Sequence, residues 1–445
     1  MIARKLDSII EQHFAHNRSA LLLQGARQTG KTVAIRKYAQ THHCDLLEIN
    51  FYEDTKARTI FEGANRVEDV LLRLSAYTSH SLQPGKTLIF FDEIQKYPDV
   101  VTWIKFLVED GRYRYALSGS LLGVEMKDIR SIPVGFMAVQ DVYPLDLEEF
   151  ARAAGVSDAV MDTLQRAWES RTEIDAIVHD SMMRIVSLYL LVGGMPDVVQ
   201  TYLDTKDLRQ VQVKQKEILR LYHWDIAQYD AADKLYLDEI FDLIPTELNA
   251  KNKRFILKDL NEHRQFARHE DGFIWLRDAG TAIPVYNVEE PKAPLLLNKQ
   301  RNLFKFFQND VGLLACQYSE NILLSILSGQ LEINYGAIYE NLVAQELLAH
   351  GWNLYYYNSK HLGEVDFLLE HNGVLPIEVK SGKDYNRHKA LANILMSDEF
   401  DIHEGYVLCN GNLRQDGKVL YLPVYMTMFI SNLRSSEPLI CPIPL

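Results

Sequence analysis

The 445-residue sequence has no run of about eighteen apolar residues, the length that a membrane-spanning helix needs. Its first ten residues, MIARKLDSII, mix charged with apolar side chains, so we expect no signal peptide. Only four cysteines are present, and they lie far apart without a CxxC pair. This spacing argues against a disulfide framework or a cysteine zinc site, and it favours a reducing cytoplasm. Because no membrane-spanning run is present, we expect no membrane partner.

Positive charge is also scarce, because 60 Asp and Glu residues outnumber 47 Lys and Arg and leave a formal net charge of −13. This balance argues against a protein that coats nucleic acid or a membrane surface, although it leaves room for a local basic patch. The composition is otherwise that of a globular protein, with 47% hydrophobic residues. The length exceeds what one hydrophobic core usually supports, so we expect two or three domains.

The stretch GARQTGKT matches the phosphate-binding pattern GxxxxGK[ST], and it lies between an apolar strand-like run and a helical pattern. In this arrangement, backbone N–H groups and a helix N-terminus converge on phosphate oxygens. Lys31 is expected to reach the outer phosphates of ATP as a catalytic residue, and Thr32 to hold Mg²⁺. The predicted ATP-binding residues are Gly25, Ala26, Arg27, Gln28, Thr29, Gly30, Lys31 and Thr32.

A second apolar run, TLIFFDEIQ, ends in two carboxylates. Asp92 is expected to contact the Mg²⁺ ion, and Glu93 to act as the general base for the attacking water. Further strands are predicted at 45–50, 113–118 and 136–142, which completes a parallel α/β sheet covered on both faces.

Ser118 ends the fourth of these strands and would lie beside the strand that carries Asp92. It either senses the γ-phosphate as a catalytic residue or is an ordinary turn serine. Residues 151–230 predict a helical lid, which the GGMP turn at 193–196 interrupts. That turn is either a hinge of the lid or a plain connector.

Residues 236–300 predict three helices followed by a β-hairpin at 281–298, the order of a winged helix-turn-helix. Within them, the stretch 251–268 is basic, because six positive residues less Asp259 and Glu262 leave a charge of +4. The positive residues are Lys251, Lys253, Arg254, Lys258, Arg264 and Arg268. The charge suits contacts with DNA phosphates, and a solvated helical face is the alternative interpretation.

Near the C-terminus, EVDFLLE and VLPIEVK flank the turn HNG and predict a β-hairpin. If Glu370 pairs with Val374, Asp366 faces Glu378 directly across the two strands. Two opposed carboxylates repel each other unless a cation lies between them. We therefore expect this pair to bind Mg²⁺.

Two further charged residues belong to the same predicted site. Lys380 falls on the face of the hairpin that carries the carboxylates, where it could stabilise a nucleophile or developing charge. Glu340 shares a helical face with Val343, Ala344 and Leu347. A carboxylate on an apolar face is costly without a partner, and a metal ion would supply one.

The stretches GARQTGKT, FFDEIQ, YALSGS and YPLDLEEF resemble AAA-type P-loop ATPases of bacteria and archaea that carry a fused C-terminal domain of undefined role. The resemblance continues through LVGGMPDVV, FKFFQNDVGLLA, GAIYENLVAQELL and the predicted C-terminal hairpin. It therefore spans nearly the whole chain, and it also implies a winged-helix-like element in the middle.

One departure concerns the arginine that such families often carry in a Gly-Arg pair. Here Phe136 follows Gly135. An arginine finger would then come from Arg112, Arg114 or Arg130, or would be absent.

The layout of Asp366, Glu378 and Lys380 resembles the PD-(D/E)xK nuclease superfamily, which has a restriction-endonuclease-like fold. That fold implies a preceding helix with a glutamate, which Glu340 supplies. The resemblance implies that Glu340, Asp366 and Glu378 are metal ligands and that Asp366, Glu378 and Lys380 are catalytic.

The expected fold class is α/β with four parts. An AAA-type P-loop ATPase core would occupy 1–150, a helical lid 151–230, a winged-helix-like domain 231–325, and a PD-(D/E)xK nuclease-like domain 326–445.

The expected function is that of an ATP-hydrolysing protein that acts as a nucleotide-controlled DNA-binding protein with a nuclease-like C-terminal domain. DNA would be contacted through the basic stretch and the C-terminal domain, and a protein partner or self-association stays open. The alternatives are a regulatory ATPase switch with a catalytically silent recognition domain, and an ATP-binding scaffold.

Overall fold

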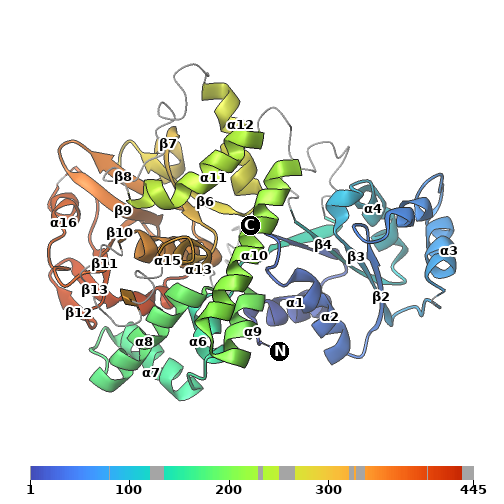
Figure 1. Cartoon of the computed structure of the whole chain (residues 1–445), viewed down its shortest axis with the longest axis horizontal. Coiled ribbons are helices and arrows are strands. Elements are labelled where there is room, and N and C mark those ends of the chain that lie inside the picture. Colours follow the sequence, from blue (N-terminus) through green and yellow to red (C-terminus); the bar gives the residue numbers. More distant parts are fainter. Residues whose placement is uncertain are drawn as a thin grey trace, which may run out of the picture.

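The computed structural model of the protein describes residues 2–79, 81–120, 135–228, 234–249, 266–319, 325–326, 336–397 and 399–432. Two β-sheets form the framework, one in each half of the molecule (Figure 1). The long helix α10 (Leu208–Gln228) runs between the halves.

The N-terminal sheet has five parallel strands in the order β2-β3-β4-β1-β5. All five predicted strands are confirmed. Their bounds are β1 (Ala20–Gln24), β2 (Asp45–Asn50), β3 (Thr87–Asp92), β4 (Arg114–Gly119) and β5 (Met137–Asp141).

Alternation along these strands explains why both faces of the sheet are covered. Leu21 and Leu23 pack against α1 (Lys5–His16) and α2 (Lys31–Thr41), whereas Leu22 faces the opposite side. On that side lie η1 (Thr55–Ile60), α3 (Val67–Thr78), η2 (Ile94–Lys96) and α4 (Val100–Asp110).

The predicted helical region contains, besides α10, the helices α6 (Leu147–Ala153), α7 (Asp158–Ser170), α8 (Ala176–Val192) and α9 (Pro196–Thr205). The GGMP turn separates α8 from α9, as predicted. The turn packs closely against the side chain of Asp310. Gly193 has φ +73°, and a β-carbon there would lie 2.1 Å from Oδ1 of Asp310. The backbone N–H of Gly194 donates to Oδ2 of Asp310 at 2.6 Å.

The middle segment differs in part from the prediction. The helices α11 (Lys234–Asn249) and α12 (Phe266–Asp278) are present, while the second predicted helix and most of the basic stretch lie outside the described residues. The hairpin consists of β6 (Ala282–Val288) and β7 (Lys299–Gln308), with η5 (Leu295–Asn298) between them. The hairpin was predicted at 281–298, but its second strand, β7, begins only after residue 298.

The hairpin is not a separate wing, because β6 pairs in parallel with β8 (Tyr355–Ser359). One sheet of eight strands results, in the order β12-β13-β11-β10-β9-β8-β6-β7. Its other strands are β9 (Gly363–Glu370), β10 (Val374–Val379), β11 (Gly405–Cys409), β12 (Arg414–Asp416) and β13 (Val419–Pro423). The sheet thus continues across the expected domain boundary at residue 325.

Four more elements complete this half: α13 (Val311–Ala315), α15 (Gly336–Ala349), α16 (Lys389–Leu395) and η6 (Val424–Phe429). The predicted register is confirmed, since Glu370 pairs with Val374 and Phe367 with Ile377. One hydrophobic cluster runs from Leu145 through α8, α10 and α15 to Ile430 and reaches the N-terminal half at Ala26, whereas the five-stranded sheet packs in two clusters of its own. Within the described residues, no single helix has the length and apolarity of a membrane span, and the bent pair α8 and α9 meets these criteria only when combined.

Candidate functional site

The loop between β1 and α2 has the backbone that its glycines allow. Gly30 has φ +90° and immediately precedes α2. Gly25 has φ +152°, and a β-carbon on it would lie 2.2 Å from the carbonyl oxygen of Val142. A larger residue would force this loop away from β5, so glycine is required at position 25.

Lys31 points into this loop. Its ammonium donates hydrogen bonds to the carbonyl oxygens of Gly25 at 3.0 Å and Ala26 at 2.7 Å. Burial lowers the pKa of Lys31 to about 8, although the charges of Glu93 and Asp92 oppose this shift. A buried cation surrounded by backbone dipoles is poised to exchange carbonyl partners for phosphate oxygens.

Asp92 is the centre of a buried polar group at the end of β3. The Thr32 hydroxyl donates to both of its carboxylate oxygens, at 3.0 and 3.2 Å. The Ser118 hydroxyl also donates to Asp92, and Nδ2 of Asn50 does so at 3.1 Å. Burial raises the pKa of Asp92. The structure thus brings together Thr32, Asp92 and Ser118 as predicted, and it adds Asn50.

Glu93 lies directly beyond the strand in a left-handed conformation, with φ 55°. Its carboxylate accepts a hydrogen bond from Nε2 of Gln95, and the Ser120 hydroxyl lies at 3.4 Å. Sequence reasoning missed Gln95 and Ser120. The available signal was that both are polar residues just past strand ends, at the edge of the sheet that carries the phosphate loop.

Arg27 faces away from the loop toward α10. Its Nε lies 2.8 Å from Oδ2 of Asp225, and the Tyr222 hydroxyl donates to the Arg27 carbonyl at 3.4 Å. The loop is therefore tied directly to the helix between the two halves.

Two of the three candidate arginine-finger residues lie away from the phosphate loop. Arg112 pairs with Asp110, and Arg114 donates to the Phe14 carbonyl. Both lie at the start of β4, the end opposite Ser118, whereas Arg130 lies outside the described residues.

Family comparisons agree with this geometry over the first third of the chain. Residues 17–151 match a family described as an AAA domain. This segment is an AAA-type P-loop ATPase domain. Residues 183–321 and 335–426 match two domains of unknown function, DUF8612 and DUF4143. No curated protein sequence matches the chain.

Three solved structures resemble it at low identity. A Walker-type ATPase of Pyrococcus abyssi is 14% identical, with a TM-score of 0.42, over 71% of this chain and 96% of that one. The ORC1 protein of Aeropyrum pernix in complex with DNA is 16% identical, with a TM-score of 0.25, over 73% and 92%. A RuvB variant of Thermotoga maritima is 17% identical, with a TM-score of 0.29, over 63% and 89%.

Away from the ATPase domain, the predicted acidic residues converge on one buried site. The confirmed register places Asp366 opposite Glu378, and Oδ2 of Asp366 accepts the Val379 N–H at 2.9 Å. The Lys380 ammonium donates to Oε1 of Glu378 at 2.6 Å. Burial and then the Asp366 charge raise the pKa of Glu378 to about 8, and the Glu340 charge adds to the effect.

A second lysine in this site was missed from the sequence. Lys305, on β7, is fully buried, and its ammonium lies 2.6 Å from Oε1 of Glu364 and 4.8 Å from the centre of the Tyr356 ring. Burial opposes its charge, but the carboxylates of Glu364, Glu340 and Asp366 raise its pKa. The available signal was a lone cation within the aromatic run LFKFFQ.

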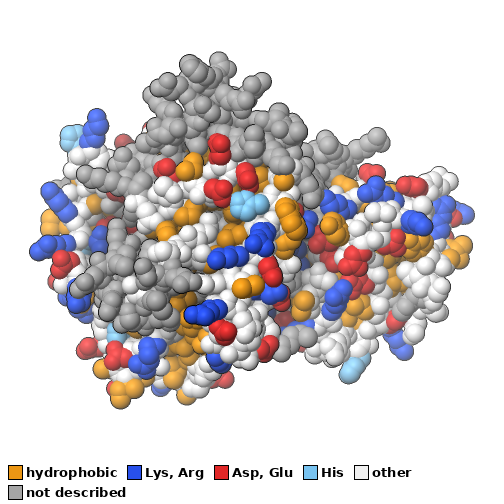
Figure 2. Space-filling view, viewed as in Figure 1, with side chains coloured by type: hydrophobic (Ala, Val, Ile, Leu, Met, Phe, Trp, Pro, Cys, Tyr) orange, Lys and Arg blue, Asp and Glu red, His pale blue; other side chains and the backbone are white. Residues whose placement is uncertain are grey.

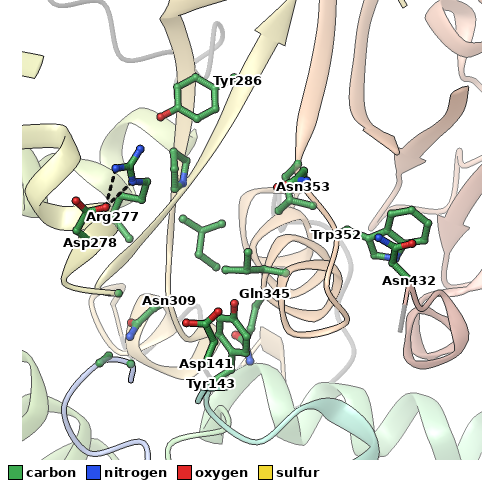
Figure 3. A pocket seen from close by; sticks show the side chains of 18 of the residues that line it. Asp141, Tyr143, Arg277, Asp278, Tyr286, Asn309, Gln345, Trp352, Asn353 and Asn432 are labelled. Atoms are coloured by element: carbon green, nitrogen blue, oxygen red, sulfur yellow. Dashed lines mark hydrogen bonds and ion pairs between the residues drawn. The ribbon is translucent and has the colours of Figure 1, made fainter. Parts of the chain in front are cut away.

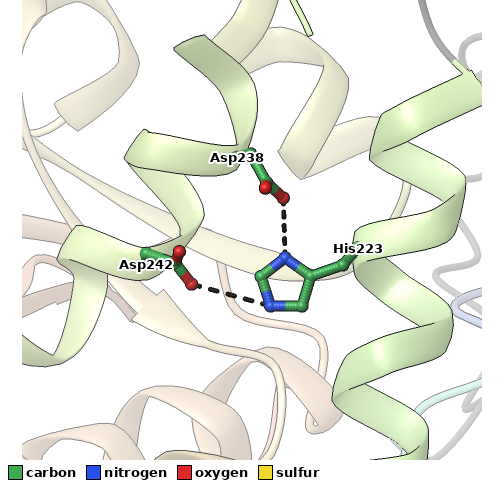
Figure 4. A group of neighbouring side chains, drawn as sticks. All are labelled: His223, Asp238 and Asp242. Atoms are coloured by element: carbon green, nitrogen blue, oxygen red, sulfur yellow. Dashed lines mark hydrogen bonds and ion pairs between the residues drawn. The ribbon is translucent and has the colours of Figure 1, made fainter. Parts of the chain in front are cut away.

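Outside both sites, His223 of α10 lies between Asp238 and Asp242 of α11 (Figure 4). Its Nδ1 is 2.6 Å from Asp238 and its Nε2 3.6 Å from Asp242. With one carboxylate on each ring nitrogen, the imidazole is held as a bridge between the two helices.

Proposed function

We propose that this protein is an ATP-hydrolysing, nucleotide-controlled DNA-acting protein whose C-terminal unit is a metal-dependent nuclease of the PD-(D/E)xK type. The observation that carries the proposal is the convergence of Asp366, Glu378 and Lys380 with Glu340 in one buried site. The elements run α15, three antiparallel strands, α16 and then β11 in parallel to β10, which is the order that this fold requires.

In the ATPase domain, we assign the residues by their contacts. Lys31 would bind the outer phosphates, Thr32 and Asp92 would hold Mg²⁺, and Glu93 would accept a proton from the attacking water. Ser118, through its bond to Asp92, would position that carboxylate.

In the C-terminal unit, Asp366, Glu378 and Glu340 would hold a divalent metal. The fit rests on Oε2 of Glu378, a buried oxygen without a hydrogen-bond partner among the described residues. If all are ionised, Glu340, Glu364, Asp366 and Glu378 contribute −4 against +2 from two lysines, and the remaining −2 suits one divalent cation. Bound Mg²⁺ supplies Lewis-acid activation of a phosphodiester, and Lys380 would stabilise the charge that develops there.

DNA contact is assigned to the basic stretch 251–268 and to the C-terminal unit. On the face shown in Figure 2, Lys and Arg side chains are interspersed with Asp and Glu over the described surface. A mixed surface of this kind argues against an extended coat of nucleic acid.

The contacts of helix α15 support the proposal that nucleotide binding in the ATPase domain controls the acidic site of the C-terminal unit. Near its start, Glu340 faces the acidic site, and near its end Oε1 of Glu346 accepts the Leu147 N–H at 2.9 Å. Between them, Gln345 bonds to the Tyr189 hydroxyl of α8 at 2.6 Å. A nucleotide-dependent shift of the segment around Leu147 would therefore be transmitted to the helix that carries Glu340.

The test is incubation of the full chain with linear, nicked, single-stranded and branched DNA, with Mg²⁺ or Mn²⁺, in the presence and absence of ATP. We expect cleavage that disappears in Asp366→Ala and Lys380→Ala and persists in Lys383→Ala, a matched lysine that is exposed three residues further on. Absence of cleavage of every DNA by the wild type would reject the nuclease.

One observation favours the alternative of a silent recognition domain. Lys305 already neutralises Glu364 without any metal. Under this alternative the wild type binds DNA or a protein partner with unchanged affinity after removal of divalent metals with EDTA.

A further inference from the structure

Three side chains with metal-ligating atoms meet where α10 packs against α11 (Figure 4). One ring nitrogen of His223 and one carboxylate oxygen each of Asp238 and Asp242 lie within 4.8 Å of one another. None of the three lines the cavity of about 890 Å³ where the ATPase domain and the C-terminal unit meet (Figure 3). The group also shares no residue with the ATP site or with the acidic site of the C-terminal unit, so neither assignment above uses it.

Helix geometry explains why both carboxylates reach the same imidazole. Asp238 and Asp242 are four residues apart on α11, so they lie on one face of the helix, one turn apart. Two like charges at this spacing repel each other, and His223 enters between them from α10 (Figure 4). The imidazole ring stands at 89° to the Phe241 ring, with 5.4 Å between the ring centres. Neighbours on α11 therefore hold the imidazole in one orientation.

The two ring nitrogens of His223 differ in how closely a carboxylate approaches them. Nδ1 lies 2.6 Å from Oδ1 of Asp238, which is the length of a short hydrogen bond. Nε2 lies 3.6 Å from Oδ1 of Asp242, which is beyond hydrogen-bond length. When the neutral imidazole donates its Nδ1 proton to Asp238, the lone pair of Nε2 points toward Asp242. A lone pair that faces a carboxylate calls for a cation between them.

The separation of Nε2 and the Asp242 carboxylate suits two ligands of one metal ion. In tetrahedral coordination with metal–ligand distances of about 2.1 Å, neighbouring ligand atoms are about 3.4 Å apart, against the 3.6 Å found here. A metal-bound histidine commonly donates its other ring N–H to a carboxylate, as His223 does to Asp238. The side chains of His223 and Asp242 are 32% and 62% exposed, so water can complete the coordination shell.

We propose that Nε2 of His223 and a carboxylate oxygen of Asp242 bind one divalent transition-metal ion, and that Asp238 is a positioning residue that orients the imidazole. The donor set indicates the class of ion. An imidazole nitrogen suits Zn²⁺, Co²⁺ or Ni²⁺, whereas Mg²⁺ and Ca²⁺ take oxygen ligands.

The site lies beside the contacts between α10 and the phosphate loop. His223 falls in the helical turn between Tyr222 and Asp225, the two residues through which α10 contacts Arg27. The bound ion fastens α11 to this turn of α10. Metal binding therefore stiffens the part of α10 that touches the ATP site.

The test is calorimetric titration of the full chain with ZnCl₂ and CoCl₂, after treatment with EDTA and without nucleotide. The ATP site and the acidic site also contain carboxylates, so the difference between variants is measured. We expect the wild type to bind one more equivalent of either ion than His223→Gln or Asp242→Asn. Asp238→Asn leaves both ligands in place, so we expect it to keep this equivalent with an affinity about 10- to 100-fold weaker. The visible absorption bands of bound Co²⁺ should persist in Asp238→Asn and lose this site's contribution in His223→Gln.

The matched control is His403→Gln, because His403 is an exposed histidine that lies 3.0 Å from a single carboxylate, that of Asp401. It should bind as many ions as the wild type. Zn²⁺ should also raise the thermal unfolding midpoint of the wild type more than that of His223→Gln, because an ion that binds only the folded chain stabilises it. If His223→Gln fails to fold, Asp242→Asn, at a largely exposed side chain, carries the same comparison.

Two results would overturn the proposal. One is an equal number of bound Zn²⁺ and Co²⁺ ions in the wild type, His223→Gln and Asp242→Asn, which would leave His223 as a protonated bridge between two aspartates. The other is an extra equivalent that Mg²⁺ replaces at equal concentration, since such a site would not use the imidazole. Loss of ATP hydrolysis or of DNA cleavage does not bear on this site.

Discussion

At the scale of single residues, substitutions of Lys31 and Glu93 test the assignments of ATP binding and ATP hydrolysis separately. Lys31→Ala removes the ammonium inside the loop, so we expect ATP affinity to fall at least tenfold and hydrolysis to be lost. Glu93→Gln keeps the shape of the side chain but removes the base, so binding persists while turnover falls by about 10²-fold or more. Both are measured by ATP binding and phosphate release.

The control for these variants is Lys86→Ala, an exposed lysine of the same domain that precedes β3. It should retain wild-type binding and turnover. ATPase rates near those of the wild type in Lys31→Ala or Glu93→Gln would overturn the site assignment.

Glu346 gives a second residue-scale prediction, on pH. Burial and then the charge of Asp146 raise its pKa to about 8, against the opposing effect of His350 and Lys5, and its other neighbour is the Tyr189 hydroxyl. An unfolded glutamate titrates near 4.3, so the stability that protonated Glu346 supplies is complete below that pH and lost as the pH rises through 8. Glu346→Gln stays neutral at every pH.

We therefore expect the free energy of unfolding of the wild type to fall relative to that of Glu346→Gln between pH 5 and 9. Urea denaturation at several pH values measures the difference. Glu169→Gln, at an exposed position of α7, should show no such pH-dependent difference. A constant difference for Glu346→Gln would show that Glu346 is already ionised in the folded chain.

At the scale of elements, the GGMP turn tests how tightly α8 is joined to α13. Gly193→Ala would drive a methyl group to within 2.1 Å of Asp310, so we expect a loss of stability well beyond the conformational cost alone. Gly63→Ala measures the cost of a positive φ without a clash, because Gly63 has φ +66° and a methyl group there would meet no atom within 4 Å. We expect about 1–2 kcal/mol for Gly63→Ala. Equal losses of stability for Gly193→Ala and Gly63→Ala in thermal unfolding would mean that the turn does not pack tightly against Asp310.

The secondary-structure elements show which parts of the fold follow from local sequence patterns and which depend on long-range pairing. The strands of the ATPase domain and the pairing of Glu370 with Val374 follow from local apolar patterns and a short turn, and both are confirmed. The parallel pairing of β6 with β8 joins segments about 70 residues apart, and no local pattern specifies it. Lys305 was missed for the same reason, since only this pairing brings β7 to the acidic site.

At the scale of the whole molecule, the helices α6 to α10 and the C-terminal sheet fold together, because a single hydrophobic cluster extends from Leu145 to Ile430. A fragment of residues 326–445 would lose β6 and β7, expose the edge of β8, and leave Glu364 without Lys305. Unpaired edges and buried carboxylates without a counter-charge are both destabilising. We therefore expect this fragment to unfold without cooperativity.

A fragment of residues 281–445 is the matched comparison, because it restores both strands and Lys305 but still lacks α8, α10 and the ATPase domain. Resistance to urea, followed by circular dichroism, should fall in the order full chain, 281–445, 326–445. A 326–445 fragment that unfolds as cooperatively as 281–445 would mean that the acidic site does not depend on Lys305. In that case the C-terminal unit would fold independently of the hairpin.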